Sequence, residues 1–129
     1  MIVECIGNRP AHLSESQQEC VRKSANLDLF PLTIGMKYTV YGVVFRAGAP
    51  WYLVMEEKDS DYPTPHFAGF FKILDNQIPV DWCFKWGTGP WPEGSFFPVK
   101  WSAPNFFERL LDGDHQAVRT FREDIHMLG

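Results

Sequence analysis

The sequence predicts an α+β domain in which a mostly antiparallel, strongly curved β-sheet is closed by helices at its C-terminal end. Residues 33–56 carry the first observation, because two runs of β-branched and aromatic residues flank a turn at residues 46–50 and so predict a hairpin. The second observation is that the first run, residues 38–45, is apolar on both faces. The third is a change after residue 104 from the two-residue period of a strand to the helical period.

The apolar residues of the first hairpin strand form two sets that point in opposite directions. One set is Tyr38, Val40 and Val44, and the other is Tyr41, Val43 and Phe45. A strand with one face in water would alternate apolar with polar residues, so we expect this strand to be covered on both sides. A curved sheet that closes on its own interior as a barrel provides that cover, and Gly42 indicates a bend or bulge within it.

Two elements are expected before the hairpin. Residues 2–6 predict a short strand that ends at a Gly-Asn-Arg-Pro turn. Residues 12–24 predict a helix with a narrow apolar stripe, in which Ser14 and Gln17 have the spacing of a capping box. With so few apolar positions, this helix is expected either to lie on the surface or to be a partly ordered insertion.

Three further strands are expected after the hairpin, at residues 67–74, 81–86 and 96–101, with an extended segment at residues 62–66 that its prolines impose. The strand at 81–86 alternates cleanly. Its two faces are Trp82, Phe84 and Trp86 on one side and Asp81, Cys83 and Lys85 on the other. We expect the aromatic face to be core beneath the C-terminal helices, in a strand near a sheet edge.

The C-terminal segment predicts two helices. Pro104 suits the first turn of one helix, and Asp114 is placed to cap a second helix with an apolar stripe. The 129 residues therefore form one domain, with a barrel core at about residues 1–101 and helices at about residues 104–128.

Composition limits the partners of this domain. The net charge is −4, from 12 Lys and Arg against 16 Asp and Glu, so the chain gains nothing from neutralising phosphates and we expect no nucleic-acid partner. The same charge suits a basic partner. Aromatic residues make up 16% of the chain, which favours some rings at a binding surface in addition to the core.

The cysteines and the N-terminal residues indicate a compartment. Cys5, Cys20 and Cys83 are odd in number and widely spaced, without a CxxC or Cys/His ligand cluster, so we expect reduced thiols and a cytoplasmic protein. The first residues lack the basic start and apolar run of a signal peptide, and no apolar run reaches the ~18 residues of a membrane span. Contact with a membrane is therefore not expected.

No set of residues in the sequence predicts a reaction, a metal or a cofactor. Nucleophilic catalysis would need Cys83 with His66 or His12 as its base, within hydrogen-bond reach. The other histidines, His115 and His126, are eleven positions apart, about 16 Å along a helix, which one metal ion cannot bridge. We therefore predict no catalytic residue, no metal ligand and no cofactor.

Part of the chain resembles a known family. Residues 33–82 contain Gly35-Met-Lys-Tyr38-Thr-Val40, Tyr52-Leu-Val54 followed by Glu56-Glu57, Tyr62-Pro63, and Phe71-Lys-Ile73-Leu-Asp75. This series resembles small SH3-like barrel proteins of bacteria and phages, most of which have no assigned activity. The resemblance covers about half of the chain and implies an SH3-like β-barrel. The insertion at 12–24 and the tail at 104–129 depart from the minimal barrel.

Two groups of residues are candidates for binding a partner. The acidic loop after the second hairpin strand holds Glu56, Glu57, Asp59 and Asp61. A later loop rich in Gly and Pro holds Trp91 between two prolines, followed by Glu93. Consecutive acids are usually solvated, and they suit a binding patch better than acid–base catalysis, which needs carboxylates across a cleft. Trp91 either contacts a partner or folds back as a lid on the core.

These observations favour a non-catalytic protein-binding domain over an enzyme. Small acidic cytosolic proteins of this size resemble bacterial immunity proteins, so our hypothesis is neutralisation of a cognate basic, nuclease-like toxin, with acids for steering and aromatic anchors for affinity. A regulatory or phage-derived accessory domain with another protein partner is not distinguished from this. The alternative class is a small-molecule-binding domain or small enzyme. Its aromatic pocket would lie between barrel and helices and be lined by Trp82, Trp86, Asp81 and Glu93.

Overall fold

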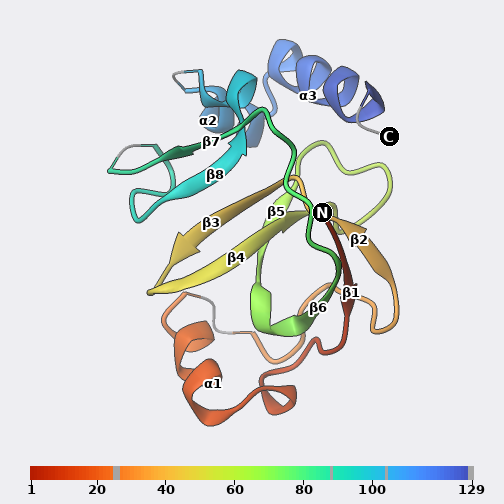
Figure 1. The fold of residues 1–129 in the computed structure, drawn as a ribbon, viewed down its shortest axis with the longest axis vertical. Helices are drawn as coiled ribbons and strands as arrows, with labels where there is room; N and C mark the ends of the chain where they lie inside the picture. Colours follow the sequence, from red (N-terminus) through yellow and green to blue (C-terminus); the bar gives the residue numbers. More distant parts are fainter. Residues whose placement is uncertain (25–26, 88, 104, 128–129) are drawn as a thin grey trace.

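The computed structural model describes residues 1–24, 27–87, 89–103 and 105–127 and has the predicted α+β architecture (Figure 1). The strands are β1 (Ile2–Cys5), β2 (Lys37–Thr39), β3 (Gly42–Arg46), β4 (Ala49–Val54), β5 (Thr64–Phe67), β6 (Phe71–Asp75), β7 (Trp82–Lys85) and β8 (Ser95–Pro98). The α-helices are α1 (Glu15–Arg22), α2 (Phe106–Leu111) and α3 (His115–Met127), and the 3-10 helices are η1 (Pro10–His12), η2 (Ala68–Phe70) and η3 (Val99–Ser102). Within these ranges, no helix is long and apolar enough to span a membrane.

In the described part of the chain, the strands form two antiparallel sheets. The small sheet has the order β2-β1-β6, and the large sheet has the order β5-β4-β3-β8-β7. Between the described strands, no pairing joins the two sheets. The antiparallel α+β class is therefore confirmed, whereas the strand pairings do not close the expected barrel.

The predicted strand at residues 38–45 is divided between the two sheets. Val40 donates its N–H to the Met1 carbonyl at 3.0 Å, and Tyr41 donates its N–H to the Leu53 carbonyl at 2.8 Å. Adjacent residues thus bond to different sheets, so the chain leaves the small sheet and enters the large one at this point. Apolar residues occupy both faces because each half of the segment contributes to a different packing layer, and not because one strand runs through a barrel.

Gly42 allows β3 to pack closely at this crossing. A Cβ atom on Gly42 would lie 2.9 Å from the Phe97 Cβ, closer than real Cβ atoms approach, and 3.0 Å from the Leu53 Cδ1. The predicted hairpin that follows is confirmed as β3 and β4, but its turn is only two residues long. Ala47 and Gly48 have φ angles of 52° and 73°, which are the positive values that a tight two-residue hairpin requires.

Two other predicted strands are interrupted by 3-10 turns. The expected strand at residues 67–74 breaks at η2, so that β5 joins the large sheet and β6 joins the small one. The expected strand at residues 96–101 ends at Pro98, and η3 continues from there. In both places the chain changes direction inside a run of apolar residues, which the period of the sequence does not reveal.

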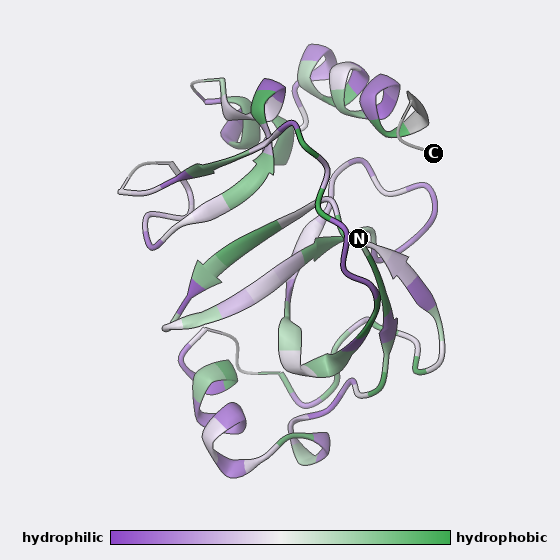
Figure 2. Ribbon diagram, in the orientation of Figure 1, coloured by the Kyte–Doolittle hydropathy of each residue, from purple (hydrophilic) through white to green (hydrophobic). Residues whose placement is uncertain are grey.

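The helices follow the predictions closely. Ser14 and Gln17 form the predicted capping box of α1. The Asp114 carboxylate caps α3 by accepting the Ala117 N–H at 2.9 Å, and this hydrogen bond, with help from Arg109, lowers the pKa of Asp114. Hydrophobic and hydrophilic residues alternate around α3 (Figure 2), and Phe121 is fully buried. Pro104 and the end of the predicted helix at residue 128 lie outside the described residues.

Aromatic contacts hold the layers of the molecule together. The small sheet packs on the large one through Phe71 and Tyr52, with ring centroids 5.7 Å apart. The C-terminal helices pack on the large sheet through Phe107 and Phe97, at 4.8 Å. Each of these rings buries on the order of 150–250 Å² of surface, so such pairs account for much of the hydrophobic core.

Candidate functional site

Strand β7 forms an open edge of the large sheet. It is last in the strand order and pairs only with β8 among the described strands, with Cys83 opposite Phe97 and Lys85 opposite Ser95. The Val99 N–H donates to the Asp81 carbonyl at 2.8 Å in the same register. Because the backbone groups of an antiparallel strand face its neighbour at every second residue, those of Trp82 and Phe84 point away from β8. The Trp82 N–H already donates to the Pro79 carbonyl at 3.3 Å, so the free outward groups of this edge are those of Phe84.

The side chains beside this edge form an exposed aromatic surface. Phe84 is 60% exposed and Trp86 is 73% exposed. Phe84 pairs with Phe96 on β8, and Phe45 and Phe84 both approach Gly94, where a Cβ would lie 3.2 Å from either ring. We call Phe45, Phe84, Trp86 and Phe96 the β7 aromatic face. Gly94, with φ of 138°, leaves a bare backbone segment between two of its rings.

The expected burial of this face beneath the C-terminal helices is wrong. Those helices lie over the opposite face of the sheet, where Phe97 contacts Phe107. Trp82 is buried, but it packs edge-on against Phe96 at 5.6 Å. The predicted alternation of residues along β7 is confirmed, but the prediction of which face the helices bury is wrong.

Trp91 takes the second of the two predicted alternatives and folds back onto the core. Its side chain is 7% exposed, and its ring centroid lies 4.9 Å from that of Phe107 and 6.4 Å from that of Phe97. In this structure a partner reaches very little of the Trp91 ring. A role for this residue in binding stays a prediction.

Glu93 stabilises the β3–β4 turn. Its carboxylate accepts the Ala47 N–H at 2.9 Å and the Gly48 N–H at 3.1 Å. Both donors belong to the two turn residues with positive φ, which lie outside the β3–β4 pairing. The observed contacts of Glu93 are therefore those of a turn-capping residue.

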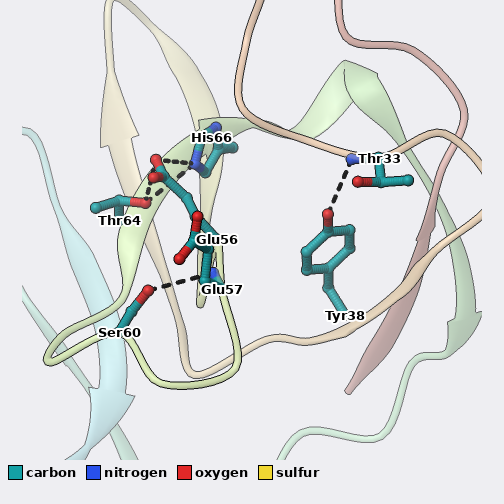
Figure 3. A network of polar contacts seen from close by, with 7 residues as sticks. All are labelled: Thr33, Tyr38, Glu56, Glu57, Ser60, Thr64 and His66. Atoms are coloured by element: carbon teal, nitrogen blue, oxygen red, sulfur yellow. Dashed lines mark hydrogen bonds and ion pairs between the residues drawn. The ribbon is translucent and has the colours of Figure 1, made fainter.

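Glu56 turns inward from the acidic loop to a buried histidine, as Figure 3 shows. Its Oε1 lies 3.1 Å from the His66 Nε2 and accepts the Thr64 hydroxyl at 3.0 Å. Thr64 Oγ1 is also 3.0 Å from the His66 Nε2. Burial lowers the pKa of His66, and the neighbouring Glu56 carboxylate opposes that shift.

The other acids of the loop are exposed at the surface. Asp61 pairs with Arg122 of α3, and the Asp59 carbonyl accepts a hydrogen bond from the same guanidinium at 3.4 Å. The carboxylates of Glu57 and Asp59 form no ion pair among the described residues.

The six predicted binding residues are not brought together. The acidic loop follows β4, whereas Glu93 caps the turn that precedes β4, so the length of that strand, roughly 20 Å, separates them. Figure 1 shows β7 and the loop between β4 and β5 on opposite sides of the molecule. The exposed acids and the β7 aromatic face are therefore two separate surface features.

The residues considered for catalysis are also separated. His66 lies on β5 and Cys83 on β7, at opposite edges of the large sheet, so four strand spacings of about 4.8 Å put them roughly 19 Å apart. His12 accepts the Asn8 N–H through its Nδ1 at 3.2 Å. In the ranges that the structure describes, no cluster of three or more His, Cys, Asp or Glu side chains is arranged to hold a metal ion.

A cavity of about 340 Å³ lies between the large sheet and α2. The residues expected to line such a pocket were Trp82, Trp86, Asp81 and Glu93, and none of them lines it. The walls come instead from the inward face of β7 and β8, the loop around Trp91, η3 and α2. Sequence reasoning missed Lys85 and Ser95 as lining residues because it assigned β7 the wrong covered face, and it missed Glu108 because it took no lining residue from the C-terminal helices.

Comparisons with known proteins give no relative from which a function could be transferred: no protein-family model, curated protein or solved structure matches the chain.

Proposed function

We propose that this protein is a non-catalytic binding domain that docks an extended segment of a partner polypeptide along β7. The observation that carries the proposal is the coincidence of two exposed rings, Phe84 and Trp86, with a strand edge whose outward groups at Phe84 bond to no described residue. Edge strands normally avoid exposed aromatic residues, because open backbone groups beside apolar side chains favour pairing with another chain. Strand addition uses these features together: backbone hydrogen bonds supply affinity and side-chain contacts supply specificity.

The partner that fits this surface is a basic polypeptide. The chain has a net charge of −4, which attracts basic partners over long range and raises their association rate. Arg and Lys side chains of an incoming strand would also stack on the faces of Trp86 and Phe84 through cation–π contacts. Neutralisation of a basic, nuclease-like toxin by an immunity protein is the biological role that we propose for this pairing.

A second copy of the chain fits this edge less well. β7 has four residues, and pairing of two such strands would bury far less than the roughly 1,200 Å² of a stable interface. A partner that also covers the β7 aromatic face would bury a larger interface area than the pairing of two β7 strands. Like charges on two copies would oppose their association as well.

The test begins with recovery of partners from the native host by the tagged protein, followed by titration of each purified partner. We expect Phe84→Ala and Trp86→Ala each to weaken binding by about 30-fold, the roughly 2 kcal/mol loss of an aromatic hot spot. Ile34→Ala is the matched control, since Ile34 is 52% exposed and lies before β2, away from β7. A partner that binds all three variants as tightly as the wild type would contradict the proposal.

Strand addition is tested separately by comparing Phe84→Pro with Phe84→Ala. Both remove the ring, but proline also removes the outward N–H, and an edge position of this kind tolerates proline. We expect the proline variant to bind more weakly than the alanine variant while melting at a similar temperature. Equal affinities would show that the backbone edge is not used, and self-association through Phe84 would identify a second copy as the occupant.

We further propose an SH3-like relationship for the two sheets and a cytoplasmic location. The crossing at Val40 and Tyr41 supports the first, because it joins two curved sheets at a corner as an open barrel would. The second is supported by free thiols at Cys5, Cys20 and Cys83.

A further inference from the structure

The cavity between the large sheet and α2 has the size and lining of a ligand site. Its volume of about 340 Å³ lies within the roughly 300–1,000 Å³ of small-molecule pockets. Trp91, Phe97 and Phe107 contribute its apolar walls, and all three side chains are otherwise buried. They pack against one another at centroid distances of 4.8–6.4 Å, so the apolar wall is held in place before a ligand arrives.

Hydrogen-bond donors stand together on the sheet side of the cavity. Lys85 and Ser95 are directly opposite each other on β7 and β8, and both line the cavity. The Lys85 ammonium donates to the Ser102 carbonyl and keeps two further N–H groups for another acceptor. This corner suits an anionic group such as a carboxylate.

Ser95 is only 5% exposed and brings a hydroxyl group to the cavity wall. This hydroxyl forms no hydrogen bond with any described residue, yet the described residues include no fully buried side-chain oxygen or nitrogen that lacks a partner. Ser95 lines the cavity, which gives its hydroxyl access to a ligand. The group is positioned to bind a ligand.

Hydrogen-bond acceptors stand on the helix side of the cavity. Glu108, in the first turn of α2, lines it and forms no ion pair with any residue of the described ranges. Asn105 precedes α2 with φ of 63° and does not cap the helix with its side chain, so its amide is also available to the cavity. Lys85 and Glu108 share one cavity without lying within 4.0 Å of each other.

We propose that this cavity binds a small zwitterion of amino-acid size with an aromatic body. Its carboxylate would meet Lys85 and Ser95, its ammonium would meet Glu108 and Asn105, and its ring would lie against the Trp91 wall. Lys85 and Glu108 are both partly exposed, and a ligand with one charge would pair with only one of them and so form one charge-assisted hydrogen bond fewer. The site uses the inward face of β7, so it does not depend on a partner at the β7 aromatic face.

The experiment is titration calorimetry with three probes that share a ring: L-phenylalanine, 3-phenylpropanoate and phenethylamine. We expect L-phenylalanine to bind at least about 10-fold more tightly than either fragment. Glu108→Gln should weaken L-phenylalanine by about 10-fold and leave 3-phenylpropanoate unchanged, and Ser95→Ala should weaken both carboxylates. Each tenfold step corresponds to one matched charge or hydrogen bond.

Glu123→Gln, a neutralised acid on the exposed face of α3, serves as the control and should bind as the wild type does. Circular dichroism establishes that each variant is folded. If Glu108→Gln disturbs α2, Ser95→Ala still tests the site, because it removes only one oxygen atom. The proposal is overturned if L-phenylalanine binds more weakly than about 10 mM, or no better than its fragments. It is also overturned if Glu108→Gln behaves like the control.

Discussion

Trp101 donates its indole N–H to the Asp124 carboxylate at 2.7 Å and so ties η3 to α3 across 23 positions of sequence. The Trp101 side chain is 1% exposed, and its ring also contacts that of Phe121 at a centroid distance of 5.1 Å. Asp124 is held from its other side by Lys100, whose ammonium lies 3.0 Å away. The last helix is thus attached by a polar contact as well as by its apolar stripe.

Replacement of Asp124 tests this attachment. Asp124→Leu leaves a buried indole N–H without an acceptor, so we expect the free energy of unfolding to fall by about 1–3 kcal/mol. Asp124→Asn keeps an acceptor oxygen and should lose less. Urea denaturation followed by tryptophan fluorescence measures both, and a leucine variant as stable as the wild type would show that water replaces the contact.

Replacement of Trp91 distinguishes a lid from an exposed contact. Because the ring is buried against Phe97 and Phe107, we expect Trp91→Ala to lower the free energy of unfolding by about 3–5 kcal/mol. Trp91→Phe retains an aromatic ring and should lose less. The melting temperature provides the measurement. An unchanged value for the alanine variant would place the ring outside the core.

Replacement of Glu93 tests its role at the β3–β4 turn. Glu93→Ala removes the acceptor for two turn amides, so we expect the free energy of unfolding to fall by about 1 kcal/mol. The structure away from this turn should not change. Glu93→Gln keeps one acceptor and should be intermediate. Hydrogen exchange at Ala47 and Gly48 should accelerate in the alanine variant, and unchanged exchange there would contradict the capping role.

Because His66 is buried, we expect the protein to lose stability in acid. Burial lowers its pKa below the ordinary value of 6.5, so the folded protein holds it neutral while the unfolded chain binds a proton more readily. The stabilising contribution is complete above about pH 6.5 and is lost as the pH falls from there toward the lower folded pKa. We expect melting temperatures measured between pH 7 and pH 5 to fall less steeply for His66→Gln than for the wild type. Parallel curves would mean that other groups cause the loss.

Local patterns predicted the elements of this fold better than their arrangement. The α1 capping box, the β3–β4 hairpin and the Asp114 cap are all set by residues within a few positions of one another, and all three are confirmed. The crossing at Val40 and Tyr41 depends on Met1 and Leu53, which are distant in sequence. An apolar run alone does not reveal a change of sheet within it.

The candidate surface was missed for a related reason. The alternation of Trp82, Phe84 and Trp86 shows that these residues share a face, but the cover of that face is decided by where the C-terminal chain packs. Phe107 packs on Phe97 instead, and so leaves Phe84 and Trp86 in solvent. Likewise the acids of the loop are adjacent in sequence, but Glu56 turns toward His66 and the others remain outside.

Strand β7 carries the exposed Phe84 ring on one side and a wall of the cavity, at Lys85, on the other. Phe84 and Lys85 are adjacent in this strand, so their side chains lie on opposite faces of the sheet. A partner and a small molecule would thus have room to bind at the same time, and any effect of one on the affinity of the other would have to be reciprocal, by the same factor.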